Sequence, residues 1–128
     1  MDKGNTVRNF NILIIIGSGL LLVLALFHGS GFVFVVDKMN QSNAASFLKE
    51  IMPVLFLQPS INLLSLACFA GITIFLKERG FPVLVLVCIF SGINLVFALY
   101  LEAYVPGAIM FMALACFLLA MRYHKSLR

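Results

Sequence analysis

Residues 81–101 read FPVLVLVCIFSGINLVFALYL, an unbroken apolar run without a charged side chain. At ~1.5 Å per residue, a helix of this length crosses the ~30 Å hydrocarbon core of a bilayer. Three further apolar segments accompany it, at residues 10–36, 51–76 and 106–121. Few residues remain for loops and tails, so these four segments decide the fold and leave no room for a soluble core.

The composition agrees with a membrane protein. Of the 128 residues, 62% are hydrophobic and 11% are charged, whereas soluble domains are about half apolar and a quarter charged. The apolar runs are continuous and do not alternate, which favours helices over barrel strands, because a helix satisfies its own backbone hydrogen bonds in lipid. We therefore predict an all-α fold, a single four-transmembrane-helix domain threaded up, down, up and down as an antiparallel bundle.

The placement of the basic residues predicts the orientation. Seven of the nine Lys and Arg residues fall on one side of the predicted bundle, namely Lys3, Arg8, Lys77, Arg79, Arg122, Lys125 and Arg128. Basic residues gather on the cytoplasmic face of membrane proteins, so both termini are expected inside. The positive charge is then explained by membrane orientation and by contact with anionic lipid headgroups, and we expect no nucleic-acid partner. The predicted location is a bacterial cytoplasmic (inner) membrane, with the polar stretch from Asp37 to Ser46 as the longest loop, outside.

Glycine and proline mark the expected turns and bends. Gly80 suits a left-handed position after a helix, and Pro82 suits the first turn of the next one. The Gly29–Gly31 stretch is the expected bend in the first segment. Pro59 is expected to kink the second segment and to free the carbonyl near Leu55, which a neighbouring helix or polar side chain must then satisfy.

Polar side chains inside apolar helices are the candidates for a site. The predicted ligand-binding residues lie at similar depth below the outer surface, or at its rim: His28, Gln58, Asn62, Asn94 and Glu102. In one interpretation they form an outward-opening pocket, with His28 as proton acceptor or ligand and Glu102 or Glu50 as its carboxylate partner. In the other, the amides join helices by hydrogen bonds and His28 satisfies a carbonyl.

The cysteines and histidines give little support to a metal or cofactor. Cys68, Cys88 and Cys116 contain no C-x-x-C pair, and although thiolates suit soft metals such as Cu(I), single cysteines in apolar helices are mostly small hydrophobic residues. His124 is expected in the cytoplasmic tail, on the opposite side from His28, so one subunit cannot ligate a haem with both. We predict no cofactor, no metal site and no catalytic residues.

These observations predict a small integral membrane protein of accessory or binding type. It is expected to act through helix packing with itself, as a homo-oligomer, or with another membrane protein, and its outer pocket is a candidate site for a small-molecule or lipid ligand. A small proton-coupled transporter that uses the cluster of His28, Gln58, Asn62 and Asn94 is the alternative. A membrane enzyme acting on a lipid or quinone ranks third, because no nucleophile–base pair is evident in the sequence.

Overall fold

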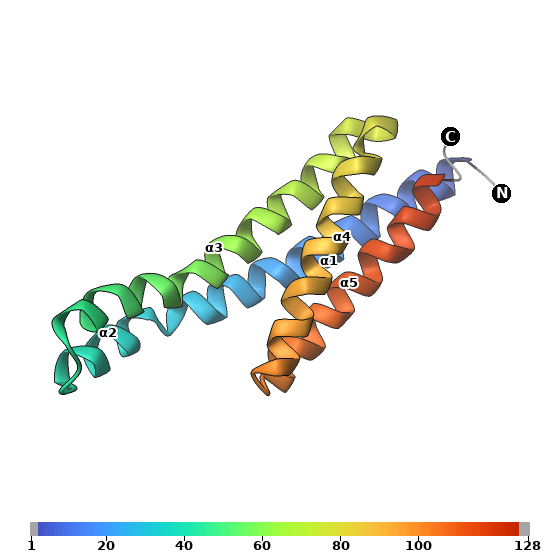
Figure 1. Ribbon diagram of the computed structural model, residues 1–128. Helices are drawn as coiled ribbons and strands as arrows, with labels where there is room; N and C mark the ends of the chain where they lie inside the picture. The colour runs from blue at the N-terminus through green and yellow to red at the C-terminus, as the bar shows by residue number, and fades with distance from the viewer. Residues whose placement is uncertain (1–2, 126–128) are drawn as a thin grey trace.

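The computed structural model of the protein describes residues 3–125 and is almost entirely helical, with 93% helix (Figure 1). In chain order the elements are α1 (Lys3–Ser30), α2 (Phe32–Gln41), α3 (Ser46–Leu76), the 3-10 turn η1 (Lys77–Gly80), α4 (Phe81–Tyr100) and α5 (Tyr104–Lys125). Among the described residues, four stretches are long and apolar enough to cross a membrane: Gly4–Gln41, Ser46–Leu76, Phe81–Tyr100 and Tyr104–His124. The all-helical prediction is confirmed, and α1 and α2 together make the first of these stretches.

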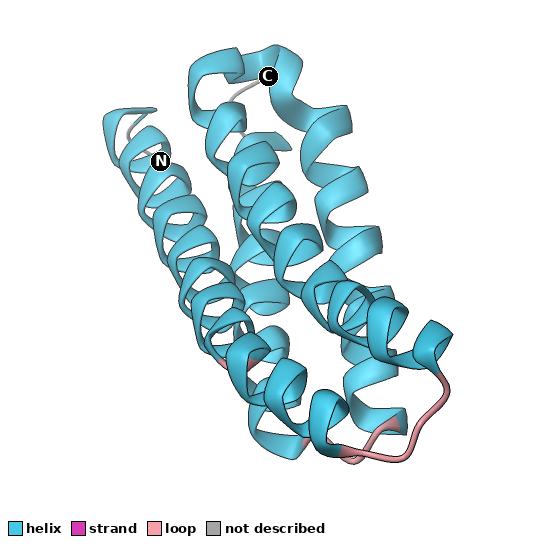
Figure 2. Cartoon of the chain, turned by 90° about the vertical axis from the view of Figure 1, so that its left-hand side faces the viewer, coloured by secondary structure: helices cyan, strands magenta, loops and turns pink. Residues whose placement is uncertain are grey.

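The helices form two hairpins whose loop ends diverge (Figure 1). The α2–α3 and α4–α5 connections lie at one end of the molecule, and η1 lies at the other end with the start of α1 and the end of α5 (Figures 1 and 2). The most extensive contacts join α1 to α5 and α1 to α3, so α1 is the central helix. Although α3 and α4 are consecutive in the chain, they pack against each other much less.

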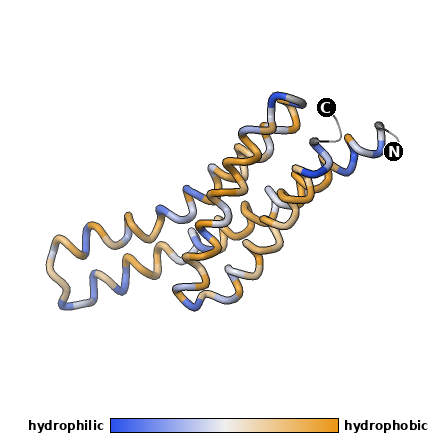
Figure 3. Tube along the Cα trace, turned by 45° about the vertical axis from the view of Figure 1, so that its right-hand side comes forward, coloured by the Kyte–Doolittle hydropathy of each residue, from blue (hydrophilic) through white to orange (hydrophobic). Residues whose placement is uncertain are grey.

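The core is apolar and so is most of the surface. The side chains without any exposed area in the core are Ile14, Leu21, Ala70, Leu84, Ala113, Phe117 and Ala120. Large apolar side chains also point outward, and Phe75 is 83% exposed. Apolar residues cover most of each helix, while hydrophilic residues gather toward the ends (Figure 3). A soluble protein rarely exposes so much apolar surface, whereas lipid would cover it.

The first segment breaks at Gly31, within the predicted bend. α1 ends at Ser30 and α2 begins at Phe32. At the break, the Gly31 N–H donates at 3.2 Å to the carbonyl of His28, three residues earlier, which is the bond of a 3-10 turn and not of a regular α-helix. A Cβ on Gly31 would lie 3.1 Å from Cζ of Phe56 in α3, so the bend brings the backbone close to the neighbouring helix.

The prediction of a long loop from Asp37 to Ser46 was largely wrong. Only residues 42–45 lie outside helices between α2 and α3, because α2 continues to Gln41 and α3 already begins at Ser46. The prediction ended each helix where the apolar run ends, but polar residues continue a helix when packing supports it. Here α2 packs against the start of α3, and Lys49 Nζ donates to the Asn40 carbonyl at 3.3 Å. Likewise α1 begins at Lys3, before the predicted residue 10, and α5 ends at Lys125.

The turn between α3 and α4 differs from its predicted geometry. Gly80 has a φ of −74°, and the left-handed residue is Lys77, with a φ of 49°. Gly80 is instead required by close packing, because a Cβ there would lie 3.0 Å from the Thr73 carbonyl oxygen. Pro82 lies in the first turn of α4, as predicted. Arg128, which contributes to the predicted orientation, lies outside the described residues.

Candidate functional site

The structure brings two of the five predicted site residues to one cavity. His28 of α1 and Asn94 of α4 both line a cavity of about 190 Å³ in the half of the bundle that carries the α4–α5 turn. The remaining lining is mainly apolar and comes from α1, α3, α4, the α4–α5 turn and α5: Leu24, Phe27, Pro59, Leu63, Phe97, Ala98, Leu101, Ala103, Pro106 and Met110. The cavity therefore offers two polar side chains in an apolar setting.

His28 is tied to the kinked helix α3. Its Nε2 lies 3.0 Å from the Phe56 carbonyl oxygen, and since a carbonyl only accepts, this nitrogen carries the proton. The imidazole also stacks on the Phe56 ring, with centroids 4.4 Å apart and planes 21° apart. Pro59 lies inside α3, as predicted. The carbonyl that His28 satisfies is one residue beyond the expected Leu55, within the turn that the proline disturbs.

Asn94 is bonded within its own helix. Its Nδ2 donates to the Phe90 carbonyl at 2.8 Å, which leaves its side-chain oxygen available to accept a hydrogen bond. His28 and Asn94 are both half-buried. The cavity thus combines a stacked, hydrogen-bonded imidazole with one amide oxygen, a setting that can orient one polar atom of a small apolar guest.

Asn62 lies in a different place. It lines a groove of about 370 Å³ between α3 and α4, two helices that pack against each other less than α1 packs against α3 or α5. Ser65 lies beside it on α3, and its hydroxyl donates to the Ile61 carbonyl of its own helix at 2.8 Å. The other walls are apolar: Leu66, Phe69, Val83, Leu86, Val87 and Phe90. The Asn62 side chain is exposed, and no hydrogen bond joins it to another side chain or backbone group in residues 3–125.

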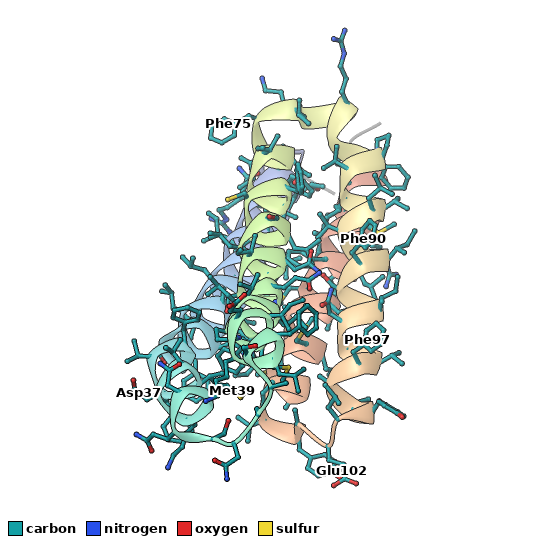
Figure 4. All side chains as sticks on the ribbon, turned by 60° about the vertical axis from the view of Figure 1, so that its left-hand side comes forward. Asp37, Met39, Phe75, Phe90, Phe97 and Glu102 are labelled. Carbon is teal, nitrogen blue, oxygen red and sulfur yellow. The ribbon has the colours of Figure 1, made fainter. Side chains whose placement is uncertain are left out.

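Gln58 and Glu102 line neither cavity. Gln58 is exposed on α3, one turn before Asn62. Glu102 lies in the α4–α5 turn with a φ of 56°, and its carboxylate points away from the helices (Figure 4). Glu50 is exposed near the start of α3. Equal depth along the helices therefore does not place the five residues around one cavity, and neither carboxylate lines the His28 cavity.

A buried histidine at the other end of the bundle was missed. His124 is 1% exposed, and its Nε2 donates to the Lys77 carbonyl at 2.8 Å. Its ring contacts the rings of Phe10 and Phe81, with centroids 5.4 and 5.5 Å away. The expectation of a histidine in a tail was wrong, because α5 continues through it to Lys125.

The sequence did contain a signal for this burial. His124 follows the buried Phe117 and Ala120 at seven and four residues, the spacing of one helix face. Its imidazole contacts three elements besides its own helix, because Phe10 belongs to α1, Phe81 begins α4, and Lys77 begins η1 directly after α3. Its Nδ1 is buried without a hydrogen-bond partner in the described part of the chain.

The cysteines do not converge on one another. Cys68 is exposed and Cys116 is half-buried, whereas Cys88 is buried and its thiol contacts the Met121 sulfur at 3.4 Å. Within residues 3–125, no three His, Cys, Asp or Glu side chains are placed to hold a metal ion together. The two histidines lie far apart along the bundle. His28 is near the end of α1 that leads into α2, whereas His124 of α5 contacts Phe10 near the start of α1.

Comparisons with known proteins add no relative: no protein-family model, curated protein or solved structure matches this chain.

Proposed function

We propose that the chain is a multi-pass protein of a bacterial cytoplasmic membrane that acts as an accessory or binding subunit, through helix packing with a second copy or with another membrane protein. The observation that carries the proposal is the open groove between α3 and α4. Its α3 wall presents the Asn62 amide beside exposed apolar side chains. An amide that meets lipid without a partner is costly, so such a face favours a neighbouring helix.

The proposed orientation places in the cytoplasm the end of the bundle that carries most of the basic residues and both chain termini. Lys77 and Arg79 then lie inside, and the α2–α3 and α4–α5 connections lie outside. Single cysteines at Asn43 and Arg79, both exposed, test this in a background that lacks the native cysteines. We expect an impermeant thiol reagent to label the Asn43→Cys protein from outside intact cells, and the Arg79→Cys protein only after the membrane is opened. Labelling of both from one side would refute the threading.

The cavity of His28 and Asn94 is proposed as the place for a small guest. At about 190 Å³ it is below the ~300–1,000 Å³ of common ligand pockets, so it suits a single side chain of a partner or a short acyl segment. The transporter alternative was motivated by four polar side chains in one cluster. His28 and Asn94 line one cavity, Asn62 lines another, and Gln58 lines neither, so this alternative has no shared pocket to support it.

The experiment that tests the function is native mass spectrometry of the protein extracted gently from its own membrane. We expect an oligomer, or a complex with a defined membrane protein. A monomer that carries a stoichiometric small molecule, lost in the His28→Ala variant, would instead favour a ligand-binding protein that needs no partner.

A further inference from the structure

One exposed face of α3 follows the heptad spacing of helices that pack in pairs. Positions that alternate by three and four residues form a continuous seam along the helix. From the outer to the inner end these are Leu55, Gln58, Asn62, Ser65, Phe69, Ile72 and Leu76. Ser65 is half-buried and the other six are exposed, with Phe69 at 53% and Ile72 at 46%. We refer to these seven residues as the α3 seam.

The seam is distinct from the face that α3 uses inside the bundle. That inner face consists of buried residues, including Leu63, Leu66, Ala67 and Ala70. The seam borders the groove against α4, because Asn62, Ser65 and Phe69 belong to both. α3 therefore presents a second, unoccupied packing surface beside a groove that can receive side chains from another helix.

We propose that the occupant of this surface is the α3 seam of a second copy of the chain, so that the protein forms a two-fold symmetric dimer. This inference rests on the proposed function and names the partner. Two copies inserted in the same orientation have parallel α3 helices, so a two-fold axis along the membrane normal places each seam residue near its own counterpart. Asn62 then meets Asn62 of the second copy, and Gln58 meets Gln58.

Amide side chains are suited to such pairing. Each amide both donates and accepts hydrogen bonds, so two identical ones satisfy each other. An acyl chain has no polar group to offer, and a different protein would have to carry its own polar residues at the same depth. A second copy supplies them by symmetry. Polar residues at seam positions also fix the register and the number of strands in paired helices.

Cysteine crosslinking in native membranes tests the geometry. In a background without the three native cysteines, Ser65→Cys places a thiol on the seam, and Leu64→Cys places one at an exposed position about 100° around the helix from it. We expect mild oxidation to form a dimer with Ser65→Cys and much less with Leu64→Cys. Equal crosslinking of the two, which indicates random collision, would overturn the proposal, as would preferential crosslinking of Leu64→Cys.

The contribution of the amides is tested by measuring the monomer–dimer equilibrium as the protein is diluted in lipid or detergent. Replacing Asn62 with Leu should weaken dimerisation roughly three- to thirty-fold, from the ~0.6–2 kcal/mol of one interhelical polar contact. Asn62→Gln keeps an amide and should retain most of the pairing, while Leu64→Ala, an exposed change on another face of α3, should leave it unchanged. Thermal unfolding of each variant confirms that the bundle is intact. Unchanged dimerisation of Asn62→Leu would overturn the inference.

Native mass spectrometry separates this inference from the proposed function. A complex with a different membrane protein that crosslinks to Ser65→Cys would leave the accessory role in place and refute the symmetric dimer. A monomer with only phospholipid in the groove would refute both.

Discussion

The ring of Phe117 occupies the space that a side chain at Gly17 would need. A Cβ built on Gly17 would lie 2.6 Å from Cε1 of Phe117, which is completely buried. This contact sets the separation of α1 and α5, one of the two most extensive helix contacts in the bundle. The absence of a side chain at one position thus allows the largest buried side chain in the core to fit.

We expect Gly17→Leu to lower the free energy of unfolding by at least the ~1–3 kcal/mol typical of overpacked cores. Gly19→Leu is the matched control, because a Cβ at Gly19 would meet nothing within 4 Å, and it should not lower stability. The measurement is unfolding in mixed detergent micelles followed by circular dichroism. Equal stability of Gly17→Leu and the parent would contradict the predicted α1–α5 packing. Adding Phe117→Leu to Gly17→Leu should recover part of the loss.

His124 is expected to stabilise the end of the bundle that contains η1. Replacing it with Phe keeps the ring contacts but leaves the Lys77 carbonyl without its 2.8 Å hydrogen bond, at a residue with positive φ. An unsatisfied buried polar group costs ~1–3 kcal/mol, so the turn should open more often. Limited trypsin digestion should then cut faster after Lys77 and Arg79. Arg122→Gln, an exposed change on the same helix, is the control, and identical digestion of His124→Phe and the parent would contradict the role.

His28 is expected to stabilise the kink of α3. His28→Leu removes the hydrogen bond to the Phe56 carbonyl and the stacking on its ring, with an expected loss of ~1–2 kcal/mol. A double-mutant cycle with Phe56→Leu isolates the ring contact, because the backbone carbonyl remains in that variant. Additive effects of the two substitutions would show that the stacked arrangement contributes nothing to stability.

The cysteines should react in the order of their exposure. In detergent, N-ethylmaleimide should modify the exposed Cys68 first, the half-buried Cys116 next and the buried Cys88 last. Unfolding in sodium dodecyl sulfate should make the three rates similar, which provides the control within one sample. Mass spectrometry of the peptides gives the order, and early modification of Cys88 would contradict its contact with Met121.

Sequence alone predicted the elements that depend on local chemistry. The helices follow from the length of the apolar runs, the first-turn position of Pro82 from its fixed φ, and the bend at Gly31 from neighbouring glycines. The helix ends were missed where packing, not hydropathy, decides them. α2 and the start of α3 support each other through polar residues such as Asn40 and Lys49.

The sequence indicates how far along its helix each candidate site residue lies, but not the direction in which its side chain points. Counting residues places Asn62 and Asn94 at similar depth, yet the direction of each side chain depends on how its helix is rotated about its axis. The buried face of α3 around Leu63 and Ala67 fixes that rotation and leaves Asn62 outside the His28 cavity. The hydrogen-bond partner of His124 could not be predicted either, because it is the backbone carbonyl of Lys77, which comes close only through the folding of the α3–α4 turn.

The unequal lengths of the apolar stretches have a consequence for the surrounding lipid. Gly4–Gln41, which spans α1 and α2, contains 38 residues and Phe81–Tyr100 contains 20. At ~1.5 Å per residue, the summed helical length is about 57 Å for the first stretch and about 30 Å for the second. Only the shorter matches a bilayer of ordinary thickness, so the longer must tilt or rise above the headgroups. The protein therefore meets a thicker apolar belt on one flank than on the other. We therefore expect the distribution of the protein among membranes to depend on bilayer thickness, and lipids with longer acyl chains to gather at the α1–α3 flank.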